Sequence, residues 1–163
     1  MRRIIYLLFV LLVIACASTK HKESTVIKVS AKDSLLASIE RSACFGKCPQ
    51  YKTIIYKSGF AEYYGKKDID KIGYYTGQLQ SDDLNKLYSL IRTYKMEEKD
   101  TSYINKYLAD YPAWELWISD LNPTKHIQIS HEAPPSEITE FGKAMDQFLT
   151  SVKWTKKIST KDE

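Results

Sequence analysis

Three neighbouring segments with strand-like patterns constrain the fold of this chain more than any other feature. Residues 35–42 alternate between apolar and polar side chains, and residues 51–56 are rich in β-branched and aromatic types. Lys57-Ser58-Gly59 is a turn signal, and residues 60–64 are predicted to return as a third strand. Strands joined by such tight turns run antiparallel, so the pattern predicts an antiparallel sheet.

Apolar residues recur at steps of three and four after Ser81, which predicts a helix over 81–94 with Ser81 as its N-cap. A second apolar stripe predicts a helix that starts at Pro135 or Ser136 and reaches residue 152. Further strands are predicted at residues 72–79, 114–119 and 125–130.

The predicted order of elements is therefore β-β-β-β-α-β-β-α. Each helix needs a surface that covers its apolar stripe, and a sheet offers that surface. The sequence thus predicts an α+β fold of two layers, with a single antiparallel sheet and both helices packed on one face. Residues 96–111 form a polar, aromatic and irregular segment, which we expect to be a long loop.

The first residues have the features of an export signal. Arg2 and Arg3 precede an apolar run over residues 4–14, which is too short to span a bilayer. Val13-Ile14-Ala15-Cys16 resembles the lipobox of bacterial lipoproteins. The resemblance implies cleavage before Cys16 and attachment of lipid to its sulfur; the alternative is a plain signal peptide with a chance cysteine.

This interpretation divides the chain and sets its location. Several acyl chains would anchor the protein stably in a membrane of the bacterial cell envelope. No aspartate follows Cys16, which by resemblance to a known sorting rule favours the outer membrane. We expect a signal peptide, a flexible tether, a single α+β domain and a disordered tail, at residues 1–15, 16–32, 33–156 and 157–163.

The net charge of the chain does not indicate a nucleic-acid partner. Arg2 and Arg3 carry two of the four net positive charges, and both belong to the predicted signal peptide. No basic stripe remains beyond residues 153–161, so we expect no nucleic-acid binding.

Cys44 and Cys48 remain as a pair after Cys16 is assigned to lipid. Gly46 between them allows a tight turn, and the envelope is oxidising, so a structural disulfide is predicted. The alternatives are a thiol redox pair, a soft-metal site for copper(I), or free thiols.

The cysteines belong to a longer motif, Cys44-Phe45-Gly46-x-Cys48-Pro49-x-Tyr51. This motif resembles that of an uncharacterised envelope family, the domain of unknown function 6438. The similarity runs from about Leu36 through the last predicted helix. The resemblance implies a location and a domain, but it implies no activity.

No catalytic motif, metal-ligand cluster or cofactor motif stands out, so we expect a binding or interaction module rather than an enzyme. Twelve tyrosines offer contact area and hydroxyl groups, although tyrosines also fill the rims of small cores. The candidate surface is either the open face of the sheet or the 96–111 loop, and the candidate partner is an envelope protein or a glycan. In the loop, the candidate residues are Tyr103, Tyr107, Asp110 and Tyr111.

Overall fold

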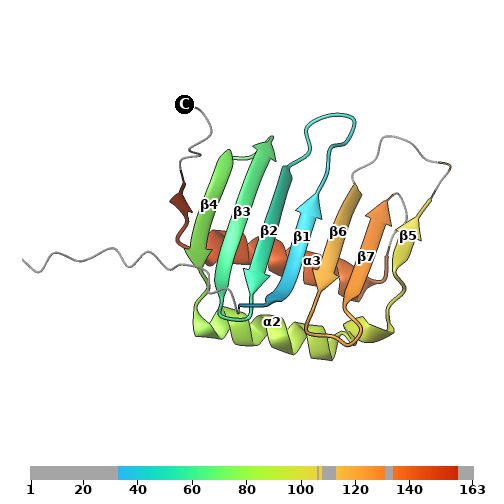
Figure 1. The fold of residues 1–163 in the computed structure, drawn as a ribbon. Helices are drawn as coiled ribbons and strands as arrows, with labels where there is room; N and C mark the ends of the chain where they lie inside the picture. Colours follow the sequence, from blue (N-terminus) through green and yellow to red (C-terminus); the bar gives the residue numbers. More distant parts are fainter. Residues whose placement is uncertain (1–32, 106, 108–112, 131–133, 158–163) are drawn as a thin grey trace, which may run out of the picture.

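The computed structural model describes residues 33–105, 107, 113–130 and 134–157. The strands in this part of the chain form one eight-stranded sheet in the order β5-β7-β6-β1-β2-β3-β4-β8 (Figure 1). Their bounds are β1 (Leu35–Arg41), β2 (Gln50–Tyr56), β3 (Phe60–Lys67), β4 (Gly73–Gln78), β5 (Ser102–Ile104), β6 (Ala113–Ile118), β7 (Lys125–Ser130) and β8 (Thr155–Lys156).

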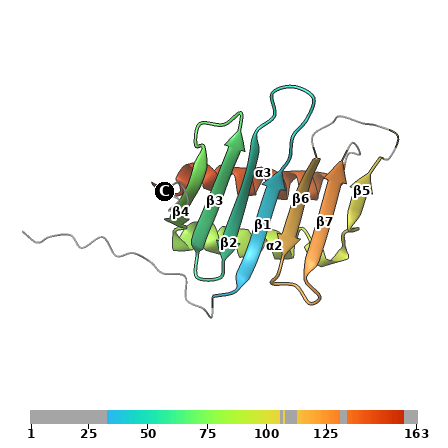
Figure 2. The ribbon, with the colours of Figure 1, turned by 45° about the horizontal axis from the view of Figure 1, so that its top comes forward.

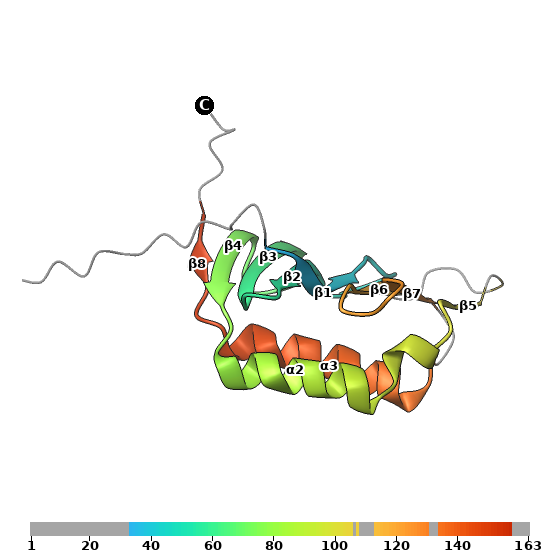
Figure 3. The same ribbon diagram turned by 60° about the horizontal axis from the view of Figure 1, so that its bottom comes forward.

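Both helices lie on the same face of the sheet. Helices α2 (Ser81–Thr93) and α3 (Ser136–Ser151) run side by side beneath it, and the short 3₁₀ helix η1 (Met96–Glu98) follows α2 (Figure 3). Leu87 and Phe141, at the centres of their apolar stripes, are fully buried in the core between the helices and the strands. The predicted α+β class with two layers is confirmed, and the opposite face of the sheet carries no described helix.

The prediction of a purely antiparallel sheet is wrong at one edge. Strand β5 pairs in parallel with β7, whereas the other neighbours are antiparallel. Strand β6 starts at the end of the sheet where β5 finishes, and β7 starts at the opposite end, where β6 finishes (Figure 1). Strands β5 and β7 are therefore both antiparallel to β6 and run in the same direction. Strand β5 also lies inside the segment 96–111 that was predicted to be a loop, and β8 was not predicted.

The alternation predicted for the central strands matches the side chains that are buried. Tyr51, Thr53 and Ile55 of β2 are all at most 5% exposed and face the helices. On β1, Ile39 is fully buried and Arg41 reaches Asp146 on α3, which fixes the face of that strand as well. The core therefore lies between the sheet and the two helices.

Local chain geometry agrees with the turn prediction and corrects one cap. Gly59 has φ of +81° in the β2–β3 turn, a conformation that suits glycine. Helix α2 begins at Ser81, but its N-cap residue is Gln80 and not Ser81. Helix α3 begins at Ser136, which is one of the two predicted starts, and its N-cap residue is Pro135.

Different connections lie at the two ends of the sheet. The β1–β2 and β3–β4 connections extend from one end, whereas Asp33 precedes β1 at the opposite end (Figures 1 and 2). Within the described ranges, none of the helices has the length and apolar character needed to cross a membrane.

Candidate functional site

The face of the sheet opposite the helices is rich in aromatic and acidic side chains. Because Arg41 and Ile39 face the helices, Ser38 and Glu40 on the same strand face away. Strand pairing then places neighbouring side chains on this open face. These side chains include Lys52, Ile54, Tyr56, Glu62, Tyr64, Tyr74, Glu115, Trp117, His126 and Gln128.

Three glutamates hold side chains together across the strands of the open face. Glu62 accepts hydrogen bonds from the hydroxyls of Tyr56 at 3.1 Å and Tyr74 at 2.7 Å. Glu40 pairs with Lys52 at 3.1 Å and with the ammonium of Lys66 at 2.8 Å. Such links between strands fix the positions of these side chains and reduce the entropy that a ligand would have to remove.

Glu115, the third of these glutamates, contacts two side chains of the neighbouring strand β7. Its carboxylate lies 3.0 Å from Nε2 of His126 and accepts a 3.4 Å hydrogen bond from Gln128. The His126 ring stacks on Trp117, with 3.7 Å between the ring centroids and 12° between the planes. One face of Trp117 is therefore covered by His126.

Tyrosine hydroxyls on the open face are held protonated. Burial, followed by the charge of Glu62, raises the pKa of Tyr56 to about 12. Burial and the hydrogen bond to Glu62 also raise the pKa of Tyr74 well above its ordinary value. The Tyr64 and Tyr74 rings stack with their centroids 4.7 Å apart. The open face thus carries neighbouring tyrosine rings whose hydroxyls are neutral.

A groove of about 270 Å³ lies on the open face beside Trp117. Ser38 pairs with Trp117 on one side and with Ile54 on the other, so a small residue lies between two large ones. Two strand spacings, about 9.5 Å, separate the backbones of Trp117 and Ile54. The remaining lining residues are Leu35, Lys52 and Tyr56. The groove thus combines apolar walls with hydroxyl and ammonium groups.

The loop residues predicted as a binding surface have different environments. Tyr107 is 97% exposed, whereas Tyr103 packs partly buried against the core. The Tyr103 hydroxyl accepts a 3.1 Å hydrogen bond from the backbone N–H of Asp100. Asp110 and Tyr111 lie outside the described residues. Of this candidate surface, only Tyr107 is thus seen to be freely accessible.

Cys44 and Cys48 have their sulfurs at disulfide-bonding distance, with the Cα atoms 5.8 Å apart. Gly46 between them has φ of +126°, so this position favours glycine, as predicted. Phe45 beside it is 90% exposed. In redox enzymes, a helix N-terminus commonly lowers the pKa of the reactive thiol. Residues 42–49, in contrast, connect β1 and β2 and contain no helix.

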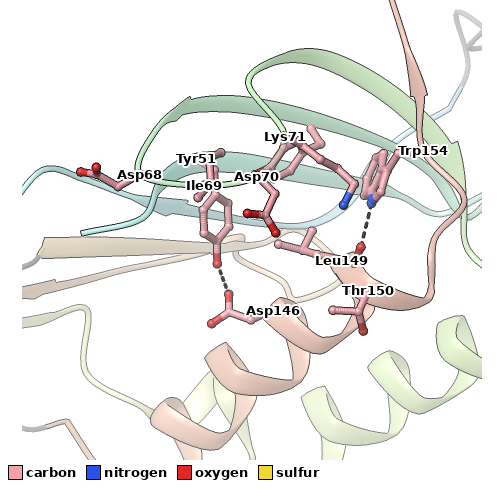
Figure 4. A pocket seen from close by; sticks show the side chains of 10 residues that line it. Tyr51, Asp68, Ile69, Asp70, Lys71, Asp146, Leu149, Thr150 and Trp154 are labelled. Atoms are coloured by element: carbon pink, nitrogen blue, oxygen red, sulfur yellow. Dashed lines mark hydrogen bonds between the residues drawn. The ribbon is translucent and has the colours of Figure 1, made fainter. Parts of the chain in front are cut away.

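A second cavity, of about 340 Å³, lies between the sheet and the end of α3 (Figure 4). At its margin, Arg41 Nη2 donates to Asp146 Oδ2 at 2.5 Å, and the Tyr51 hydroxyl donates to Oδ1 of Asp146. The Arg41 guanidinium also lies 4.9 Å from the centroid of the Trp114 ring. This network connects β1, β2, β6 and α3, and the sequence analysis did not identify it.

The network shifts the ionisation of its members. Burial lowers the pKa of Arg41, but the hydrogen bond and charge of Asp146 outweigh it, so the pKa rises. Burial and the hydrogen bond to Asp146 raise the pKa of Tyr51 far above its ordinary value. Arg41 therefore stays charged and Tyr51 stays neutral, which suits a structural clamp.

Within residues 33–105, 107, 113–130 and 134–157, no three His, Cys, Asp or Glu side chains are grouped to hold a metal.

Comparison with known proteins bears on the family and not on an activity. No curated protein and no solved structure matches the chain. The family model for a domain of unknown function, DUF6438, matches residues 36–149. The matched span runs from β1 into the last turns of α3 and contains the Cys44–Cys48 loop, Asp146 and all the lining residues of the groove except Leu35. The chain therefore belongs to the DUF6438 family.

Proposed function

We propose that this protein is lipid-anchored in the bacterial cell envelope and binds a glycan on the open face of its sheet. The observation that carries the proposal is the groove beside Trp117. Ligand sites are typically concave and mostly apolar, with a few polar groups that fix orientation. The groove has this composition, and it lies on the one broad sheet face that the described helices leave uncovered.

A sugar ring fits the chemistry of the groove better than a peptide does. Trp117 is 37% exposed, and a sugar ring carries C–H groups on its faces that pack on aromatic rings. Trp117 and Ile54 line the groove on either side of Ser38, which is only 4% exposed, so a sugar ring would lie on these two side chains. The Tyr56 hydroxyl donates to Glu62, so its oxygen remains as an acceptor for a sugar hydroxyl, and the Lys52 ammonium, although paired with Glu40, has further N–H groups to donate. A peptide would instead add to a sheet edge, and the edge strands β5 and β8 offer only three and two residues for such pairing.

The Trp117→Ala variant is expected to weaken glycan binding at least about tenfold. Truncating an aromatic residue at the centre of a binding site costs about 2 kcal/mol or more, and 1.4 kcal/mol corresponds to a factor of ten. The measurement is co-sedimentation of the full chain with envelope polysaccharides, followed by titration calorimetry with the bound fraction.

Tyr107→Ala is the matched control, because it removes an exposed aromatic ring from a loop that does not line the groove. Unchanged binding in Trp117→Ala, or loss only in Tyr107→Ala, would exclude the groove. Capture of a protein and of no polysaccharide would assign the open face to a protein partner instead.

The anchoring part of the proposal is supported by the lipobox-like sequence that ends at Cys16. In cells fed labelled palmitate, we expect the native chain to be labelled and found in the membrane fraction. The Cys16→Ser variant is expected to lose both the label and the membrane association. A double Cys44→Ser, Cys48→Ser variant controls for the thiols and should keep both; label on Cys16→Ser would contradict the proposal.

A further inference from the structure

A different part of the molecule, the cavity between the β3–β4 loop and α3, has the features of a small-ligand site. Its volume of about 340 Å³ falls in the usual range of small-molecule pockets, about 300–1,000 Å³. The inner wall is aromatic and comes from Tyr51, Tyr63 and Trp154. Leu149 and Thr150 of α3 line the side opposite the loop (Figure 4).

The aromatic wall is held in a defined arrangement. The Tyr63 ring lies between its neighbours, with centroid distances of 5.7 Å to Tyr51 and 5.5 Å to Trp154. The Trp154 indole N–H donates a 2.8 Å hydrogen bond to the backbone oxygen of Leu149, which fixes the ring at the cavity. A ligand would therefore meet a preformed apolar surface, which lowers the cost of binding.

Two opposite charges enter the cavity from adjacent residues of the β3–β4 loop. The carboxylate of Asp70 and the ammonium of Lys71 both project into it (Figure 4). Among the described residues, neither group takes part in an ion pair. Asp146, in contrast, is engaged by Arg41 and Tyr51. Asp68 also lines the cavity, but its carboxylate points away from the centre (Figure 4), so the charges that face the centre are the Asp70 carboxylate and the Lys71 ammonium.

The loop that carries these charges is fixed on the strand below it. A Cβ atom on Gly65 would lie 1.8 Å from the backbone oxygen of Lys71 and 2.6 Å from Cδ1 of Ile69. The chain therefore lies directly on the glycine, and Ile69 packs against the core. Burial raises the pKa of Tyr63 to about 12, and the carboxylate of Asp70 adds to the effect, which agrees with Asp70 near that wall.

We propose that this cavity binds a small zwitterion, an α-amino acid or a short peptide that carries both an ammonium and a carboxylate. Asp70 pairs with the ligand ammonium, which also gains from the neighbouring aromatic rings. Lys71 pairs with the ligand carboxylate, and the apolar part of the ligand lies against Tyr63, Trp154 and Leu149.

The test compares three probes that share one apolar side chain and differ in the charged groups they keep. Leucine has both groups, leucinamide lacks the carboxylate, and 4-methylpentanoate lacks the ammonium. Binding to the full chain is followed by the NMR resonance of the Trp154 indole N–H, assigned with Trp154→Phe. Leucine is expected to give a saturable shift. The two single-charge probes are expected to bind at least about tenfold more weakly, because each loses one partly exposed charge-assisted contact.

Matched variants locate the site within the loop. Asp70→Asn and Lys71→Gln are expected to weaken leucine binding about tenfold or more, and both side chains are exposed, so the fold should persist. Asp68→Asn is the control, because Asp68 lies at the margin of the same cavity but its carboxylate points away from the centre (Figure 4). Thermal melting verifies that all three variants fold.

Several results would overturn the proposal. One is no saturable shift with leucine or with dileucine. Another is leucinamide bound as tightly as leucine, which would indicate a site for organic cations. A third is a loss in Asp68→Asn equal to that in Asp70→Asn, which would indicate a general effect of loop charge.

Discussion

Replacing Phe141 with alanine is expected to lower the free energy of unfolding by about 3–5 kcal/mol, the usual cost of removing a buried aromatic ring. Phe141 is fully buried in α3, where it belongs to the core between the helix and the sheet. The loss combines the transfer energy of the ring with the cavity that remains, because neighbouring strands cannot collapse into it. Urea unfolding followed by circular dichroism measures the change as a shift of the midpoint at constant slope.

Phe45→Ala makes the same chemical change on a side chain that is 90% exposed, so it controls for the loss of a phenylalanine in itself. Its free energy of unfolding should remain within about 0.5 kcal/mol of the native value, as for most surface substitutions. Equal losses in the two variants would contradict the position of α3 against the sheet.

Gly65→Ala is expected to destabilise the protein by about 3 kcal/mol, the upper end of the usual range for overpacking. The new Cβ would overlap the backbone oxygen of Lys71, at 1.8 Å, and backbone cannot rotate away as a flexible side chain can. We therefore expect the β3–β4 loop to lift from the strand. Amide hydrogen exchange of residues 66–72 should accelerate more than that of β1 and β2.

Lys66→Ala is the control, because it changes the next residue on β3 and its side chain is 55% exposed. It removes only the surface ion pair with Glu40, which is worth about 0–1 kcal/mol. Unchanged stability and unchanged exchange in Gly65→Ala would show that the loop does not lie on the glycine. Since the loop carries Asp70 and Lys71, the same substitution should also weaken leucine binding.

The central part of the fold could be predicted because its side-chain pattern is unambiguous. Trp114, Leu116 and Ile118 alternate with Glu115 and Trp117 along β6, and this pattern separates the buried face from the open face. A one-residue change of register would expose the apolar set, so the pattern is strongly constrained. The open face was therefore a candidate surface from the sequence alone.

The tyrosine pairs were only partly predictable. An adjacent pair on a strand points to opposite faces, and Tyr63 is 5% exposed while Tyr64 is 37% exposed. Tyr74 and Tyr75, in contrast, are both half-buried, because β8 covers part of β4 and Tyr74 stacks on Tyr64. Packing from neighbouring strands thus changes what the alternation alone predicts.

The edge strands could not be predicted, because they are too short to carry a pattern. Strand β5 has three residues and β8 has two, and both form where the chain passes an open edge of the sheet. The Arg41–Asp146 contact was missed for another reason, since the two residues are 105 positions apart. Arg41 shares the phase of Ala37 and Ile39, and this position of a charge on an apolar face was the available signal.

The two short edge strands have a consequence for whether copies of the protein associate with one another. An exposed sheet edge is a row of unpaired N–H and C=O groups, and it pairs readily with the edge of another molecule. Here β8 covers β4 at one edge and β5 covers β7 at the other. Strands β4 and β7 are therefore paired on both sides along the residues that β8 and β5 cover. Edges of two and three residues present few unpaired N–H and C=O groups, which disfavours the joining of copies strand to strand into extended sheets.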